Sequence, residues 1–247
     1  MEIAEHIQVV HAEGQLLADA AERAGADAKV ATCPDWQVRD LVRHQGAVHR
    51  WATAFVAEGA TDPRPMPDVP PGLDGDALFA WFREGHRRLV DTLTNARPDV
   101  ECFAFLPAPS PLAFWARRQA HETTVHRLDA VSALPQAPRD EPGRITEEFA
   151  VDGIDELLRG FHARGRSRVR SDAPRVLRLR ATDADVTWTV RITQDPPMTE
   201  RGASADAECE VSGPAARLYL SLWNRLPFPN VSGDASLAAL WRERSGV

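Results

Sequence analysis

Residues 110–133 (SPLAFWARRQAHETTVHRLDAVSA) constrain the fold more than any other segment, because a helix there carries a carboxylate and an imidazole on its inward stripe. Ser110 is a favourable N-cap and Pro111 suits the first helical position, so a helix is predicted. Steps of three and four residues from Leu112 follow one face of this helix through Trp115, Gln119, Glu122, His126 and Asp129. The segment is therefore predicted to be a helix that carries chemically active groups.

The spacing of Glu122 and His126 is suited to a metal ion. Side chains four residues apart on a helix lie roughly 6 Å from each other and point the same way, so both can reach one divalent cation. The alternative interpretation is an ordinary surface ion pair. A zincin-type protease does not fit, because its H-E-x-x-H motif needs histidines four apart, whereas His121 and His126 are five apart.

A third ligand must come from another element, and His44 is the best candidate. A helix is predicted from residue 36 or 37 to residue 58, with apolar and small positions repeating in sevens along one stripe. His44 lies beside that stripe, whereas His49 lies about 140° further round the helix and should not join it. Cys33, in the TCPDW turn about two turns upstream, is too far from His44 to be a natural ligand. The predicted metal ligands are therefore His44, Glu122 and His126.

The first two thirds of the chain read as an all-α, four-helix bundle. Helices are predicted at about residues 2–24, 36–58, 76–95 and 110–133, and the proline-rich residues 59–73 predict a long crossover loop. A fifth helix, capped by Thr146, is expected to close this first domain.

The last part of the chain reads as a small α+β domain. From Leu177 the hydrophobic period changes to two, and the turn sequence TDAD separates two such runs, so a hairpin is predicted. A third strand (AECEVS) and two helices (ARLYLSLWNR and LAALWRER) follow. We expect two domains, at residues 1–163 and 172–247.

Composition excludes several classes of function. With 29 Lys plus Arg against 36 Asp plus Glu, the formal net charge is −7, which argues against nucleic acid or an anionic membrane as partner. No apolar run is long enough to span a bilayer and the N-terminus lacks a secretory core, so a cytoplasmic protein is expected, as a monomer or homodimer. Three widely spaced cysteines favour neither disulfides nor a thiolate zinc site.

The chain contains the segments TCPDWQVRDLVRHQGAVHRW and WARRQAHETTVHRLDA, and later GPAARLYLSLWNRLP and VSGDASLAALW. The first two resemble the signature segments of the mycothiol-dependent maleylpyruvate isomerase family, and the later two resemble that family's appended C-terminal domain. The resemblance implies a DinB-like metal-dependent four-helix bundle. It also implies zinc on His44, Glu122 and His126, the residues that periodicity selects independently.

The resemblance further implies mycothiol as cosubstrate and a catalytic role for Arg225. Zinc would activate the thiol, which would add to an electrophilic small molecule, as in an isomerase or a thiol S-transferase. The alternatives are a zinc hydrolase and a non-enzymatic metal-containing binding or regulatory protein. Two imidazoles and a carboxylate also accept nickel or iron(II), so the metal stays open at this point.

Overall fold

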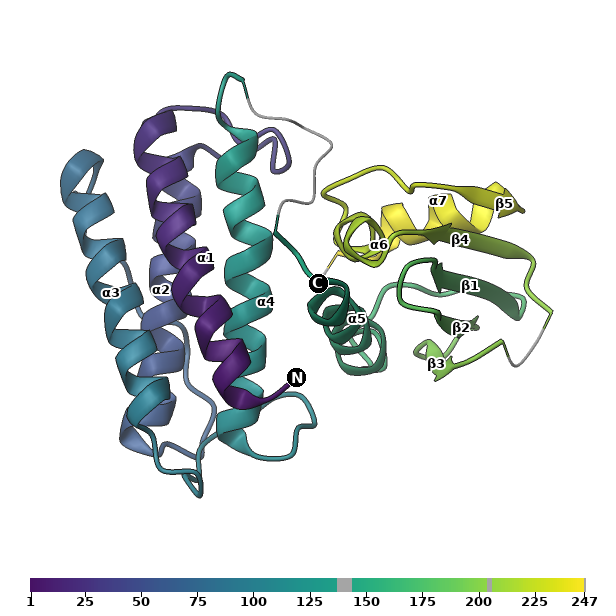
Figure 1. Cartoon of the computed structure of the whole chain (residues 1–247), viewed down its shortest axis with the longest axis horizontal. Helices are drawn as coiled ribbons and strands as arrows, with labels where there is room; N and C mark the ends of the chain where they lie inside the picture. The colour runs from purple at the N-terminus through teal and green to yellow at the C-terminus, as the bar shows by residue number, and fades with distance from the viewer. Residues whose placement is uncertain (137–143, 204–205, 247) are drawn as a thin grey trace. The chain divides into compact units, whose positions relative to one another are not determined.

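The computed structural model describes residues 1–136, 144–203 and 206–246 of the chain (Figure 1). The chain forms two compact units, Met1–Arg139 and Asp140–Val247. The first unit is all-α and the second is α+β, which confirms the predicted fold class. The division falls earlier in the chain than residues 163–172, so the fifth helix lies in the second unit.

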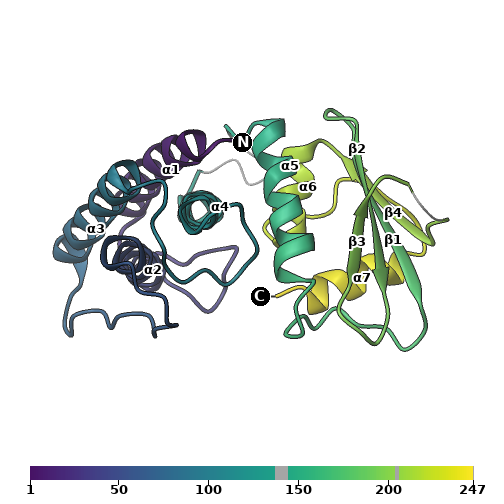
Figure 2. The same ribbon diagram turned by 90° about the horizontal axis from the view of Figure 1, so that it is seen from below.

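The first unit is a four-helix bundle. Its helices are α1 (Ile3–Ala24), α2 (Val38–Glu58), α3 (Gly75–Asn95) and α4 (Pro111–Ser132). Helices α1 and α2 each pack against both α3 and α4. Helix α1 therefore lies across the bundle from α2, and α3 lies across from α4 (Figure 2). Residues between α2 and α3 form no helix, as their prolines predict.

The ends of these helices follow from local chemistry. Gly59, with a φ of 62°, adopts the left-handed conformation that ends α2, and a side chain would be strained there. Ser110 accepts a hydrogen bond from the Ala113 amide and Pro111 occupies the first turn, so α4 begins where the sequence predicts. A buried layer that includes Leu17, Leu41 and Phe82 holds the helices together.

The second unit is a five-stranded sheet with helices. Its elements are α5 (Glu147–Asp155), η1 (Glu156–Phe161), β1 (Arg175–Ala181), β2 (Val186–Ile192), β3 (Met198–Arg201), β4 (Cys209–Gly213), α6 (Ala215–Leu222), β5 (Val231–Gly233) and α7 (Ala235–Arg244). The strand order is β3-β2-β1-β4-β5, and β1 and β4 are the parallel pair. Helices α6 and α7 both contact β1 and β4 and lie on the same side of the sheet (Figure 2).

The predicted hairpin is confirmed. Strands β1 and β2 pair antiparallel, with Leu179 opposite Trp188, and both side chains are fully buried. On the opposite face, Arg178 and Arg180 pair with Glu210 of β4. The two-residue period of the sequence therefore matches one buried face and one ion-paired face.

Three details of the second unit differ from the sequence prediction. Strands β3 and β5 were not predicted, because runs of four and three residues are too short to show alternation. Helix α6 ends at Leu222 and not at Arg225, because Asn224 adopts a left-handed φ of 61° just beyond it. Helix α5 continues into the π-helical turn η1, which has no clear sequence signature.

Among the described residues, no helix combines the length and apolar character that crossing a bilayer requires.

Candidate metal centre

Helix α4 carries two of the predicted ligands and a second carboxylate on one face. Glu122, His126 and Asp129 lie at positions i, i+4 and i+7, which brings them to the same side of the helix. The side chain of Asp129 is fully buried, and that of His126 is 10% exposed. The polar face that the sequence predicts is therefore an interior face of the bundle.

His44 of α2 completes the predicted set. One ligand atom from each of His44, Glu122 and His126 lies within 4.8 Å of the other two. Glu122 Oε1 is 3.4 Å from Nε2 of His44 and 3.4 Å from Nε2 of His126. The structure thus brings together the three side chains that the sequence analysis selected.

The separation of 3.4 Å is informative about what holds these atoms. Good N–H···O hydrogen bonds are shorter, about 2.7–3.2 Å. Two ligand atoms of a tetrahedral metal ion with bonds of about 2.1 Å lie roughly 3.4 Å apart. The spacing is long for a hydrogen bond and matches the separation of two ligand atoms on one cation. Side-chain exposures of 30% for His44 and 22% for Glu122 leave the cluster open on one side.

Neighbouring side chains fix the orientation of two of the three groups. The guanidinium of Arg118, one turn before Glu122, donates from Nη2 to Glu122 Oε2 at 3.1 Å. Nδ1 of His126 lies 2.8 Å from Oδ2 of Asp129, so the ring presents Nε2 to Glu122. The ligand atoms of Glu122 and His126 are thus each held in place by a contact to the far side of their own side chain.

The electrostatics of the cluster favour a positive charge. Burial opposes ionisation of Glu122, but hydrogen bonds from His126 and His44 and the charge of Arg118 hold its pKa well below the usual range. Burial also opposes the charged form of His126, yet its hydrogen bonds to Asp129 and Glu122 raise its pKa to about 9. Without a metal, a proton satisfies this site, and metal binding would displace that proton.

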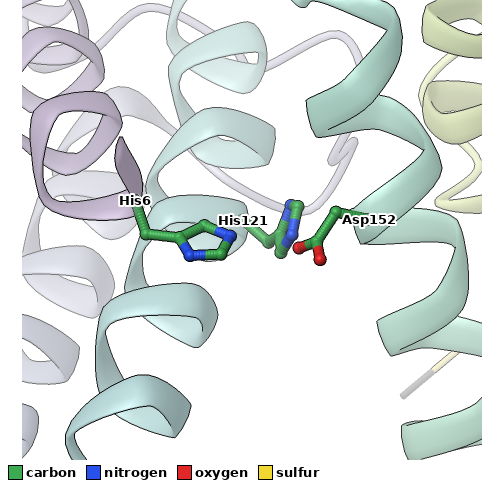
Figure 3. A group of neighbouring side chains, drawn as sticks. All are labelled: His6, His121 and Asp152. Carbon is green, nitrogen blue, oxygen red and sulfur yellow. The ribbon is translucent and has the colours of Figure 1, made fainter. Parts of the chain in front are cut away.

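The histidines that the sequence analysis set aside do not join this group. His49 is fully buried, and its Nε2 lies 2.8 Å from the Gln45 amide and 3.0 Å from Thr123 Oγ1. His121 points to another side of α4, where its ring meets that of His6 of α1 edge to face at 6.1 Å (Figure 3).

Cys33 is not part of the group formed by His44, Glu122 and His126. Its sulfur is 3.6 Å from Oδ2 of Asp129, on the Nδ1 side of His126 and away from the Nε2 that faces Glu122. That Cys33 is not a metal ligand stays a prediction. All three cysteines are free thiols.

Arg225 lies in the second unit, in the turn after α6. Its Nη1 donates to the backbone carbonyl of Trp223 at 2.8 Å, and its amide donates to Leu220 at 2.8 Å. These bonds set the direction of the guanidinium within that turn.

Sequence reasoning missed two neighbours of the cluster. Arg118 continues the four-residue spacing of Glu122 and His126, so the periodicity contained a usable signal. No such signal pointed to Trp36, because its position depends on how the α1–α2 connection folds. Its ring centroid lies 5.2 Å from that of His44 and 6.0 Å from that of His126.

Two family models match the chain. The family model described as "Mycothiol maleylpyruvate isomerase N-terminal domain" matches residues 8–131, and "MDMPI C-terminal domain" matches residues 148–240. Among curated proteins, none matches the chain.

Two solved structures share the fold. One is titled "Crystal structure of the mycothiol-dependent maleylpyruvate isomerase H52A mutant", with a TM-score of 0.61 and 15% identity. The other is titled "Crystal structure of the mycothiol-dependent maleylpyruvate isomerase", with a TM-score of 0.58 and 16% identity. Each alignment covers 89% of this chain and 88% of the other. With both family models matching in order over nearly the whole chain, the protein belongs to the mycothiol maleylpyruvate isomerase family.

Proposed function

We propose that this protein is a metal- and mycothiol-dependent enzyme that adds an activated thiolate to an electrophilic small molecule. The observation that carries the proposal is the 3.4 Å spacing of Glu122 Oε1 from Nε2 of both His44 and His126. Family membership supplies the thiol and the class of reaction. Zinc is the metal we propose, because two imidazoles and one carboxylate are a common zinc set with an open fourth position.

The side chains of the bundle have distinct roles in this proposal. His44 and His126 offer their Nε2 atoms, and Glu122 offers one carboxylate oxygen because Arg118 holds the other. The exposed side of the cluster leaves room for a ligand from solution. A bound zinc ion lowers the pKa of a thiol ligand, so that thiolate predominates at neutral pH.

The reaction that gives the family its name is a cis–trans isomerisation of maleylpyruvate. Addition of the thiolate to the conjugated double bond forms a carbon–sulfur bond and leaves a carbon–carbon single bond about which the adduct rotates. Elimination then breaks the carbon–sulfur bond and returns the same thiolate, so the thiol is not consumed. An S-transferase would instead retain the adduct as its product.

For Arg225 we propose recognition of a substrate carboxylate or of an enolate that develops on the substrate. A guanidinium presents a planar fork of donors that matches a carboxylate, and the turn after α6 orients it. We expect Arg225→Ala to lose roughly 2–4 kcal/mol of transition-state stabilisation, about a hundredfold or more in kcat/KM, at unchanged metal content. Equal kcat/KM in Arg225→Ala and the parent, at full metal occupancy and saturating thiol, would remove Arg225 from the reaction.

The deciding experiment combines elemental analysis of the purified protein with a turnover assay. We expect about one zinc ion per chain and conversion of maleylpyruvate, or conjugation of another electrophile, only when mycothiol is supplied. A variant with all three cysteines replaced by alanine should keep this activity. Turnover without any thiol would indicate a hydrolase instead. A protein that holds the metal but converts none of the electrophiles would indicate a binding or regulatory role.

A further inference from the structure

The connection between α1 and α2 folds back on itself as a closed turn, residues 28–38, which we call the 28–38 turn. Lys29 and Gln37 form an isolated antiparallel bridge, and the Val30 amide donates to the Trp36 carbonyl at 3.1 Å. The Val38 amide donates to the Ala28 carbonyl at 2.9 Å. The turn is therefore a defined element with its own backbone hydrogen bonds.

One buried carboxylate of α4 anchors this turn. Thr32 Oγ1 donates to Asp129 Oδ1 at 2.6 Å and lies 3.1 Å from Ser132 Oγ. The thiol of Cys33 lies 3.6 Å from the other carboxylate oxygen, Oδ2. Asp129 has no exposed surface, so these contacts, and not water, satisfy its charge on the side of the turn.

The same carboxylate also holds a predicted metal ligand. Asp129 Oδ2 lies 2.8 Å from Nδ1 of His126. A hydrogen-bond acceptor at one ring nitrogen of a histidine keeps the proton on that nitrogen and fixes the ring, so the other nitrogen can bind a metal. Loss of such an acceptor typically costs about 10–100-fold in metal affinity. Asp129 thus faces the turn with one oxygen and the ligand with the other.

The position of Trp36 follows from this arrangement. Its indole lies against both imidazoles, nearly parallel to that of His126, with an interplanar angle of 19°. Trp36 is at the end of the turn that Thr32 attaches to Asp129. The indole can keep its place over the two histidines only while the turn stays docked on α4.

We propose that Asp129 is a positioning residue that serves both elements at once. It orients His126 for the metal, and it docks the 28–38 turn so that Trp36 covers the two imidazoles. The inference rests on the metal site of the proposed function. Its second half, the docking of the turn, concerns the protein before any metal is bound.

The test uses three variants of the full chain. Asp129→Ala removes both contacts. Asp129→Asn keeps the shape and can still accept from Nδ1 of His126, because the Thr32 hydroxyl can accept from the new amide. Thr32→Val is the matched control, since it removes the hydroxyl that joins the turn to Asp129 and leaves the bond between Asp129 and His126 in place.

Zinc affinity is measured by competition with a chelator. We expect a loss of about 100-fold for Asp129→Ala and about 10-fold for Asp129→Asn. Thr32→Val should stay within about threefold of the parent. Parent-like affinity in Asp129→Ala, or equal losses in Asp129→Ala and Thr32→Val, would overturn the orienting role. If Asp129→Ala does not fold, parent-like affinity in Asp129→Asn overturns it.

The docking of the turn is measured without metal, from the indole fluorescence of Trp36. Subtracting the same background with Trp36→Phe isolates this signal from the other tryptophans. Asp129→Ala and Thr32→Val should both shift the emission of Trp36 to longer wavelength, as expected for an indole that gains water, and Asp129→Asn should shift it less. Unchanged emission in both would overturn the docking role. A parent protein that binds no zinc would refute the proposed metal site, whereas this measurement would still decide the docking of the turn.

Discussion

Two polar clusters lie side by side in the bundle, one residue apart in the sequence, and they have opposite character. His44, Glu122 and His126 form the first, with Asp129 behind it. The second joins Gln45, His49 and Thr123. Gln45 follows His44, Thr123 follows Glu122, and His49 lies one helical turn after Gln45. We call these the acidic cluster and the neutral cluster.

The comparison shows what decides the state of a buried histidine. In the acidic cluster, two carboxylates raise the pKa of His126 to about 9 against the effect of burial. In the neutral cluster, burial and the nearby His86 hold the pKa of His49 well below its usual range. Hydroxyl and amide partners provide hydrogen bonds without negative charge, so His49 stays a neutral packing group. Carboxylates, and not burial, therefore distinguish a candidate metal site from polar packing.

The largest expected effect comes from removing the charge of the acidic cluster. Glu122→Gln removes the anionic ligand and breaks its ion pair with the buried guanidinium of Arg118. We expect zinc affinity to fall by at least about a thousandfold, or about 4 kcal/mol. Calorimetric titration of zinc into the metal-free variant measures this. Thermal unfolding without metal is the control for folding, and parent-like affinity would contradict the assignment.

The pH dependence of stability tests whether a histidine beside the neutral cluster, His86, stays uncharged in the folded protein. Burial, opposed in part by a hydrogen bond to the His11 backbone, lowers the pKa of His86 to about 4. The unfolded chain takes up a proton near pH 6.5 and the folded bundle does not, so the contribution of His86 is present above pH 6.5 and is lost as pH falls toward 4. The loss amounts to roughly 3 kcal/mol.

Urea unfolding at several pH values, followed by circular dichroism, tests this contribution. His86→Gln stays neutral, so its free energy of unfolding should fall less steeply than that of the parent between pH 6.5 and 4. His162 of the second unit also has a pKa of about 4 and contributes to both curves, and the difference between the curves removes it. Parallel curves would show that His86 is charged, or accessible to protons, in the folded state.

A smaller effect is expected from crowding His86, whose ring centroid lies 5.5 Å from that of His49 in the neutral cluster. A methyl group at Gly14 would lie 2.2 Å from Cε1 of His86, so Gly14→Ala forces the buried ring to move. We expect a loss of about 1–3 kcal/mol in stability, as for overpacked cores. Zinc affinity should be unchanged, because the ligands lie in the other cluster. A parallel loss of zinc affinity would mean that the clusters are coupled.

The smallest effect is expected for Thr123→Val, which adjoins Glu122 but belongs to the neutral cluster. The variant removes the hydroxyl that contacts Gln45 and His49, at a cost of about 1–2 kcal/mol in stability. Zinc affinity should stay within about threefold of the parent. This variant is the matched control for Glu122→Gln, since the two positions are adjacent on α4. A large loss of affinity would show that ordering of α4, and not the carboxylate, governs metal binding.

The fold was largely readable from the sequence because its signals are local. Helical periodicity, the Ser110 cap and Gly59 located the helices of the bundle, and alternation located the hairpin of β1 and β2. Strands β3 and β5 were not predicted, because each depends on pairing with a neighbouring strand and has too few residues to show a period.

The candidate site divides in the same way. The helical spacing of Glu122 and His126 by itself determined that they share a face, and the stripe of α2 selected His44, because a regular helix fixes the direction of its side chains. Only the tertiary structure decided that Thr32 and His126 meet on Asp129 and that Trp36 lies against the imidazoles. The contact between Thr32 and Asp129 spans 97 positions of the chain. It runs through an irregular turn, whose path depends on what it packs against and not on any repeat in its sequence.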